Sequence, residues 1–324
     1  RRRPAVSLGA CGSGRAAERL VAHAGQPMSA DAAFTKRCRP DASHTRCSIS
    51  QRTRTLFARG VLTPPATQPS ASDSFTFARI EGPTAAQEWA AMATRGHGPD
   101  VRRRLAGHII APLVALHRAN REGLDLPRLD PWRRVHSRLG GGKAAAALGA
   151  ERMRAICTLA ARLQANDLPT PRAFGLVHGD FHLGQLIRPL NRDGFILVDL
   201  DDLGVGPPEA DIANCAATIA TSPHLHGGMI PRGARDLMDQ LGAAYGEASE
   251  TRLEPRRLSW HAAIALLRRT LKLAERVGHA NGADANIATA AEFASKAELS
   301  DRVAPRHPID TSAATVPDRM GIRP

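Results

Sequence analysis

Residues 175–213, GLVHGDFHLGQLIRPLNRDGFILVDLDDLGVGPPEADIA, decide the fold of this chain. A short apolar run leads into the polar loop His178-Gly179-Asp180, and two more apolar runs flank the turn Asp193-Gly194. Asp-Gly between apolar runs is a strong hairpin signal, so these runs are predicted to pair over residues 186–200. The second strand ends in Asp199, and the hairpin would therefore fold two polar loops back onto one spot.

Three polar side chains in this stretch have a spacing suited to phosphoryl transfer. Gln185 lies five residues after Asp180, and Asp199 follows the hairpin. The chemistry needs a carboxylate to orient and deprotonate an attacking hydroxyl, and oxygen ligands to hold Mg²⁺ against nucleotide phosphates. Kinase catalytic loops place an Asp, an amide side chain and a second Asp in this order. Asp180 is thus the candidate base, and Gln185 and Asp199 are the candidate metal ligands.

The same residues resemble the aminoglycoside phosphotransferase and choline kinase superfamily, which is similar in fold to protein kinases. The family's His-Gly/Asn-Asp is matched by residues 178–180, its Ile/Val-Asp by Val198-Asp199, and its Asp-Ile/Leu-Ala by residues 211–213. Gln185 departs from the Asn of most members. The sequence His-Leu-Gly-Gln at residues 182–185 resembles a maltokinase-like branch of the family, in which Gln occurs at this position. Gln has the same amide oxygen as Asn, so it is still able to bind a metal ion.

The resemblance implies an α/β (α+β) fold with two lobes. A small β-containing nucleotide lobe is expected over residues 1–81, a mainly helical C-lobe over 82–299, and a flexible tail over 300–324. The family hinge would fall at Glu81, where backbone groups would pair with adenine. Asp211, in the first turn of a helix, would be the family's structural aspartate.

Several segments of the C-lobe repeat apolar residues with helical spacing. The expected helices are residues 85–93, 101–117, 151–165, 210–220, 231–246 and 259–277. Residues 127–142 are instead predicted to be a loop, with the three glycines 140–142 as a mobile connector. His117, at the end of a helix, is expected to have a capping or packing role.

The small lobe holds one candidate for phosphate binding. Residues 32–36 are predicted to form a strand ending in Lys36, and the resemblance makes Lys36 the lysine that reaches the α- and β-phosphates. A surface lysine at a strand end is the alternative. Residues 45–59 are predicted to be helical, at the place of the helix that carries the lysine's glutamate partner. That glutamate is missing, since no Asp or Glu occurs between Asp41 and Asp73.

Three other segments of this lobe have weaker signals. Phe75 and Phe77 alternate with small and polar residues, which predicts a strand at 74–80. The glycines at residues 9–14 are either a loop over phosphates or a flexible leader, and residues 14–25 are predicted to be a short helix.

Composition limits the class of partner. The 324 residues carry a formal net charge of +13, and a basic chain favours anionic partners, of which ATP is one. Twelve Lys and Arg against three Asp and Glu place nine of these charges in residues 1–59. Nucleic acid is a second interpretation, but this basic stretch is not interleaved with aromatic residues for base stacking. We therefore do not expect a nucleic-acid partner.

The cysteines and the hydropathy indicate a cytoplasmic protein. The five cysteines are scattered without a CxxC pair, as expected in a reducing compartment. They are Cys11, Cys38, Cys47, Cys157 and Cys215. No apolar run approaches the length of a membrane span. Arg1–Arg3 are not followed by the apolar core of a signal peptide, and we expect no membrane partner.

Together these features predict a kinase that uses Mg²⁺ and ATP to phosphorylate a hydroxyl of a small molecule, with sugar or aminoglycoside-like acceptors first. Asp180 would take the hydroxyl proton, and His178 would brace the catalytic loop. Gln185 and Asp199 would bind Mg²⁺, while Asp201 or Asp202 could assist. The alternative is a catalytically weak or inactive kinase-like nucleotide-binding or scaffold protein.

Overall fold

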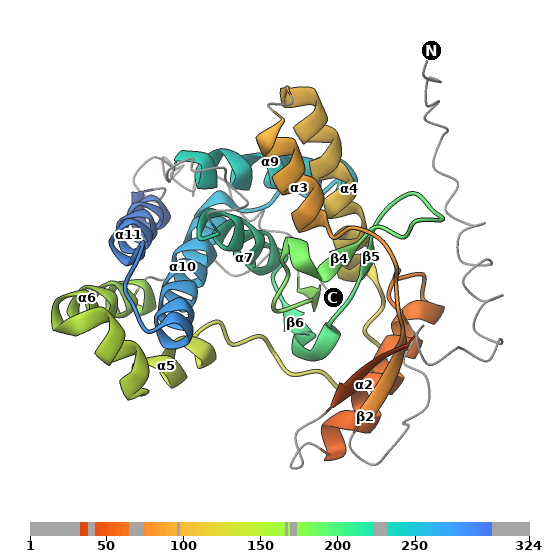
Figure 1. Cartoon of the computed structure of the whole chain (residues 1–324), viewed down its shortest axis with the longest axis horizontal. Helices are drawn as coiled ribbons and strands as arrows, with labels where there is room; N and C mark the ends of the chain where they lie inside the picture. The colour runs from red at the N-terminus through yellow and green to blue at the C-terminus, as the bar shows by residue number, and fades with distance from the viewer. Residues whose placement is uncertain are drawn as a thin grey trace, which may run out of the picture.

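The computed structural model places a small antiparallel sheet and one helix beside a larger helical body (Figure 1). It describes residues 33–37, 43–64, 74–95, 98–165, 168, 174–222 and 232–299. The predicted glycine-rich turn at 9–14, helix at 14–25 and tail at 300–324 lie outside the described residues. Both lobes of the expected two-lobed α+β fold are therefore present.

The small lobe consists of two strands and a helix. Strand β1 (Ala33–Arg37) pairs antiparallel with β2 (Ser74–Ala78), and Lys36 lies opposite Phe75. Helix α2 (Ser43–Ala58) connects them in sequence. These elements confirm the strand, helix and strand that the sequence predicts here, to within two residues at most ends. The sequence of α2 contains no carboxylate, so α2 cannot supply an acidic partner to Lys36.

Helix α2 and the residues after it attach the small lobe to the body through backbone groups. The Arg59 guanidinium donates from Nη2 to the carbonyl of Glu122, at 2.7 Å. The amide of Leu197, in the hairpin, donates to the carbonyl of Leu62 at 2.8 Å. These bonds join the small lobe to both the helical body and the hairpin.

The helical body is built around one long buried helix. Its helices are α3 (Ala85–Thr94), α4 (Pro99–Arg118), α5 (Arg133–Leu139), α6 (Gly142–Gln164), α7 (Glu209–Ala220), α9 (Arg232–Ser249), α10 (Pro255–Val277) and α11 (Ala283–Leu299). Helix α10 is buried along its apolar face and packs against α7, α11 and α6 (Figure 1). No helix in the described part of the chain is both long enough and apolar enough to cross a bilayer.

The structure confirms the six helices predicted for the C-lobe and corrects one loop. The helix predicted over 151–165 begins earlier, at Gly142, with a break at Gly149. Residues 127–142 are not a continuous loop, because α5 forms within them. Gly140 and Gly141 make a tight link between α5 and α6, in which their amides donate to the carbonyls of His136 and Arg138 at 3.1 Å each. The glycines therefore turn the chain between two helices.

Short strands carry the segment that the sequence singled out. Strand β3 (Gly175–Val177) pairs antiparallel with β6 (Gly204–Gly206), and β4 (Leu186–Ile187) with β5 (Ile196–Leu197). The predicted hairpin is confirmed, but its second strand ends before residue 200. Asp199 is the reason, since its φ of 62° and ψ of 58° are left-handed and break the extended conformation.

Candidate active site

Asp211 holds the loop after β3 in place. Its buried carboxylate accepts hydrogen bonds from the amides of His178 and Gly179 at 2.7 and 2.9 Å. The two amides belong to the residues that directly follow β3, and Asp211 lies in the first turn of α7. A carboxylate that accepts several amide protons is well stabilised in its charged form. The expected structural role of Asp211 is thus visible in the geometry.

A histidine from α4 completes the surroundings of Asp211. His117 Nε2 lies 3.0 Å from Asp211 Oδ2, and its Nδ1 lies 3.0 Å from the hydroxyl of Tyr245 on α9. Burial alone would raise the pKa of Asp211, but the hydrogen bond from His117, together with the interactions with His117 and His178, brings it below its usual value. Helices α4, α7 and α9 are therefore joined by polar contacts beneath the loop, and His117 has the packing role expected of it.

His178 connects the two polar loops. Its Nε2 lies 3.0 Å from the carbonyl of Val198, just before the acidic loop. The amide of Asp180 donates to His178 Nδ1 at 3.4 Å, so the ring carries its proton on Nε2. His178 is fully buried. This geometry is that of a brace between the loops.

Asp180 lies among cationic and amide side chains. Its Oδ1 accepts from Arg268 Nη2 at 2.8 Å, and Arg134 Nη1 lies 3.6 Å from the same oxygen. Asn214 on α7 also approaches Oδ1, at 3.5 Å. Burial by itself would raise the pKa of Asp180, but the charges of Arg268, then Arg134 and Lys272, hold it below its usual value. The carboxylate is therefore ionised and oriented.

The predicted metal ligands lie next to each other. Gln185 Nε2 donates to Asp199 Oδ2 at 2.8 Å, across the hairpin that brings the two loops together. The left-handed conformation of Asp199 turns its side chain toward Gln185 instead of continuing the strand. A non-glycine residue in that conformation costs energy and is typical of functional sites.

The side chains at this position fit Mg²⁺ better than they fit a metal ion whose ligands all come from the protein. No group of three or more His, Cys, Asp or Glu side chains that could hold a metal occurs in the described chain. Mg²⁺ usually takes only one or two protein ligands, with phosphate oxygens and waters as the rest. Asp199 supplies a carboxylate and Gln185 an amide oxygen, Oε1, so the pair matches that pattern.

The remaining predicted site residues lie in other elements. Asp202 pairs with Arg134 of α5, and Asp201 beside it is exposed. Glu81 is exposed, and its carbonyl accepts from the amide of Leu190, in the hairpin turn, at 3.1 Å. Lys36 lies on β1 in the small lobe. The roles given to Lys36 and Glu81 remain predictions.

No role was assigned from the sequence to three residues that lie beside Asp180. Arg134 comes from α5, which was expected to be a loop. Asn214 lies three residues after Asp211, on the same side of α7, and such a helical spacing is the one signal that could have indicated it. Arg268 comes from the middle of α10, almost ninety residues after Asp180, and no local pattern in the sequence indicates that contact.

Comparison with solved structures shows the same fold. A putative aminoglycoside phosphotransferase from Ralstonia eutropha superposes with a TM-score of 0.59 at 13% identity, covering 82% of this chain and 86% of the other. An aminoglycoside phosphotransferase from Streptomyces rimosus, solved with ADP and streptomycin, gives 0.51 at 18% identity, with coverages of 81% and 98%. A choline/ethanolamine kinase family protein from Mesorhizobium loti gives 0.52 at 16%, with 88% and 96%.

The sequence itself also matches a family model. No curated protein gives a significant match to the chain. Residues 29–261, however, match the model of the phosphotransferase enzyme family, which spans both lobes and includes every residue of the predicted site. The match agrees with the fold and covers more than half of the sequence, and the chain therefore belongs to the phosphotransferase enzyme family.

Proposed function

We propose that this protein transfers the γ-phosphoryl group of ATP to a hydroxyl of a small molecule. The proposal is supported by the link between two polar loops. His178, which Asp211 holds through its amide, contacts Val198 from the loop that carries Asp180. Asp199, next to Val198, is hydrogen-bonded to Gln185. Family membership supports a phosphotransferase, and the Streptomyces rimosus relative was solved with ADP. Sugar and aminoglycoside-like compounds are the acceptor classes to test first.

Each residue then has a defined part. Asp180 orients the acceptor hydroxyl and takes its proton, while His178 keeps the loop in register. Asp199 and Gln185 hold Mg²⁺, which when bound neutralises charge on the phosphates. Lys36 contacts phosphate oxygens from β1, and the backbone at Glu81 contacts the base. Because phosphoryl transfer passes through a loose transition state, positioning matters more here than a strong base.

The proposal predicts acceptor-dependent turnover of ATP. Protein, Mg²⁺ and γ-labelled ATP would be incubated with a broad panel of hydroxyl compounds, and labelled products would be separated. Transfer of label to an acceptor, lost on chelation of Mg²⁺, is the expected result. Nucleotide binding without transfer to any acceptor would instead favour the second candidate below.

A kinase-like protein that binds nucleotide with weak or no catalysis is the second candidate. It is favoured by the absence of any carboxylate on α2, so that the helix cannot pair with Lys36. Measuring nucleotide affinity and turnover on one preparation separates the two candidates. A cytoplasmic location and a lobe boundary near Glu81 belong to the same proposal.

A further inference from the structure

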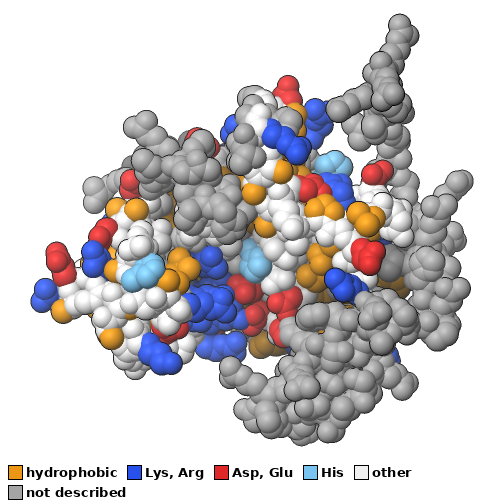
Figure 2. All heavy atoms as spheres, viewed as in Figure 1, with side chains coloured by type: hydrophobic (Ala, Val, Ile, Leu, Met, Phe, Trp, Pro, Cys, Tyr) orange, Lys and Arg blue, Asp and Glu red, His pale blue; other side chains and the backbone are white. Residues whose placement is uncertain are grey.

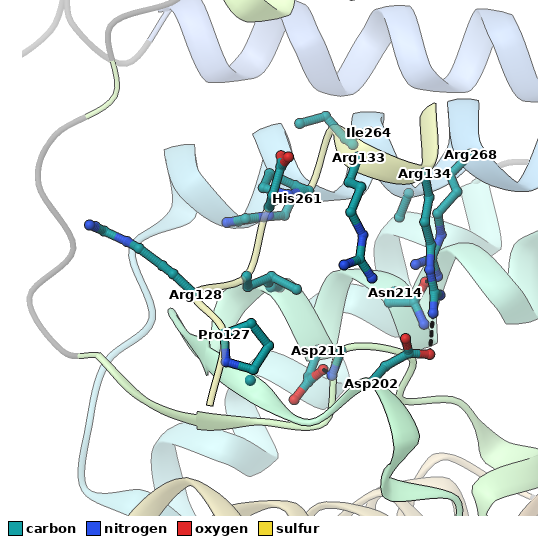
Figure 3. A pocket seen from close by; sticks show the side chains of 17 residues that line it. Pro127, Arg128, Arg133, Arg134, Asp202, Asp211, Asn214, His261, Ile264 and Arg268 are labelled. Atoms are coloured by element: carbon teal, nitrogen blue, oxygen red, sulfur yellow. Dashed lines mark hydrogen bonds and ion pairs between the residues drawn. The ribbon is translucent and has the colours of Figure 1, made fainter. Parts of the chain in front are cut away.

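A basic pocket adjoins the catalytic loop on the side away from the predicted metal ligands. It lies between the segment 127–131, helix α5, the start of α7 and the middle of α10 (Figure 3). Gly179 and Asp202 form its edge toward the catalytic loop, and neither Gln185 nor Asp199 lines it. The pocket is therefore placed for the acceptor of the proposed reaction and not for the nucleotide.

Arginines supply the charge of this pocket. Arg133, Arg134 and Arg268 extend into it from α5 and α10 (Figure 3). The side chain of Arg133 makes no hydrogen bond or ion pair with any described residue. Arg268 uses one nitrogen, Nη2, for both Asp180 and Asn214, so its Nε and Nη1 have no partner in the described chain. These guanidinium groups keep donors available for a ligand.

Further cations continue from Arg268 along α10. Lys272 and Arg276 follow at intervals of four residues, which puts all three on one side of the helix. Burial lowers the pKa of Lys272, Asp180 opposes this, and neighbouring Arg269 and Arg276 lower it again. Like charges are thus held close together beside Asp180, and a bound anion would relieve their repulsion.

The carboxylates near the pocket are already engaged. Asp202 pairs with Arg134, Asp211 accepts from two loop amides, and Asp180 accepts from Arg268. Asp130 is exposed and accepts from the amide of Trp132 at 2.9 Å. Ammonium groups are usually recognised by available carboxylates or by aromatic faces. Among the residues that line this pocket, His261 has the one aromatic ring, so the pocket suits a cation poorly.

We propose that the acceptor is a hydroxyl compound with an anionic group, either a carboxylate or a phosphate monoester. Arg133 and Arg268 bind this group, and its hydroxyl is presented to Asp180. The proposal rests on the function proposed above. In the reaction, the hydroxyl oxygen forms a bond to the γ-phosphorus, and the bond from that phosphorus to the bridging oxygen breaks. ADP keeps the electron pair, and the hydroxyl proton passes to Asp180.

The experiment separates binding of an acceptor from contact of these cations with the γ-phosphate of ATP. Binding would be measured by calorimetry with the nucleotide site filled by Mg²⁺ and a non-hydrolysable ATP analogue. The ligands share one size class and differ in charge: glucosamine, glucose, gluconate and glucose 6-phosphate. Inorganic sulfate is added as a probe without a carbon skeleton. Nucleotide affinity and labelled transfer from ATP are recorded separately.

Two matched variants test Arg133, whose side chain has no partner among the described residues. Arg133→Gln removes a charge from the pocket, and Arg103→Gln removes one from an exposed position on α4, outside the pocket lining. Gluconate, glucose 6-phosphate or sulfate should bind more tightly than glucose and glucosamine. Loss of a charge-assisted hydrogen bond should weaken that binding about 10-fold or more in Arg133→Gln, with the value in Arg103→Gln unchanged.

Other outcomes overturn the inference without touching the proposed function. Tighter binding or faster transfer with glucose or glucosamine would show an acceptor of another charge. Anion binding that is equal in both variants would show that Arg133 does not bind the anion and that this pocket is not its site. Failure of all three anions to bind would also refute the basic acceptor pocket. By contrast, Arg133-dependent anion binding without any phosphoryl transfer would keep the anion site and reject the kinase activity.

Discussion

At the scale of single residues, burial and charge act against each other at Asp180. Burial favours the neutral acid, but Arg268 and Arg134 lie within 2.8 and 3.6 Å of Oδ1 and keep the carboxylate ionised. An ionised Asp180 can accept the hydroxyl hydrogen bond at any physiological pH. The sequence motif predicts the carboxylate but not its arginine neighbours, because these come from helices distant in sequence.

Asp180→Asn tests the catalytic carboxylate. The amide keeps the shape but cannot accept a proton, so kcat for a true acceptor should fall about 10²–10⁴-fold, with nucleotide Kd little changed. Asp193→Asn, at the exposed hairpin turn, is the matched control. Steady-state kinetics and nucleotide titration on the same preparations check this result. A variant that retains near-normal transfer would show that Asp180 is not the base.

Substitutions of Asp199 and Gln185 are predicted to affect Mg²⁺-dependent nucleotide binding to different extents. Asp199→Asn removes the formal charge of the pair and should abolish Mg²⁺-dependent nucleotide binding while the protein stays folded. Gln185→Asn keeps an amide oxygen with shorter reach and should be milder. Nucleotide titrations with and without Mg²⁺, together with a thermal melt, give both measurements. Unchanged Mg²⁺ dependence in Asp199→Asn would remove Asp199 from the metal site.

At the scale of elements, the predictable parts have local signals and the unpredicted parts do not. The hairpin follows from Asp193-Gly194 between apolar runs, and α7 from its apolar periodicity. Helix α5 has seven residues and begins after Trp132 without a side-chain cap, so nothing local marks it. Helix α11 was missed too, since it is alanine-rich and its sides differ little in polarity. Tertiary packing against α6 and α10 stabilises both.

The loop between β3 and Asp180 requires a glycine. Gly179 has a φ of +79°, and a Cβ there would collide with the backbone carbonyl of Asp202. Gly179→Ala should therefore cost about 2–4 kcal/mol of unfolding free energy, from left-handed strain plus the clash. Gly278, at the end of α10, has a φ of +72°, and no atom lies within 4 Å of the position that a Cβ would take. Gly278→Ala should show the conformational cost alone, about 1 kcal/mol.

Urea denaturation of both alanine variants checks this difference. Equal destabilisation would mean that the carbonyl of Asp202 moves aside easily, and that the contact between the two loops is loose. A larger loss in Gly179→Ala would show that the two loops are tightly packed, as the bonds of His178 also indicate.

At the scale of the whole molecule, the two lobes and their order follow from the sequence, whereas the gathering of arginines beside Asp180 does not. The segment 81–83 is joined to the hairpin, since the carbonyls of Glu81 and Pro83 accept from the amides of Leu190 and Arg188. The small lobe, the hairpin and the catalytic loops thus form one connected unit. A net charge of +13 is all that composition gives, whereas the folded chain brings Arg134 of α5 and Arg268 of α10 beside Asp180. Figure 2 shows a group of Lys and Arg side chains next to Asp and Glu side chains on the face in view.

The stability of the whole fold should fall in mild acid. Burial lowers the pKa of His182 to about 4 and that of His261 to about 3, with Asp180 partly opposing this at His182 and nearby Arg257 adding to it at His261. An unfolded histidine takes up its proton near pH 6.5. Below that pH the unfolded state binds more protons than the folded state. The contribution of these two histidines to the free energy of unfolding is therefore complete above pH 6.5. It is lost as the pH falls toward about 4 for His182 and about 3 for His261.

Thermal melts from pH 7.5 to 4.5 measure this loss. Each histidine should add a slope of at most about 1.4 kcal/mol per pH unit. His261→Gln removes one of the two groups, so its stability should decline less steeply with falling pH than that of the unmodified protein, even if it is lower at pH 7.5. His108→Gln, at an exposed position on α4, is the control for loss of a histidine. Parallel curves for all three proteins would show that His261 is not held neutral by the fold, because a group with equal proton affinity in both states contributes no slope.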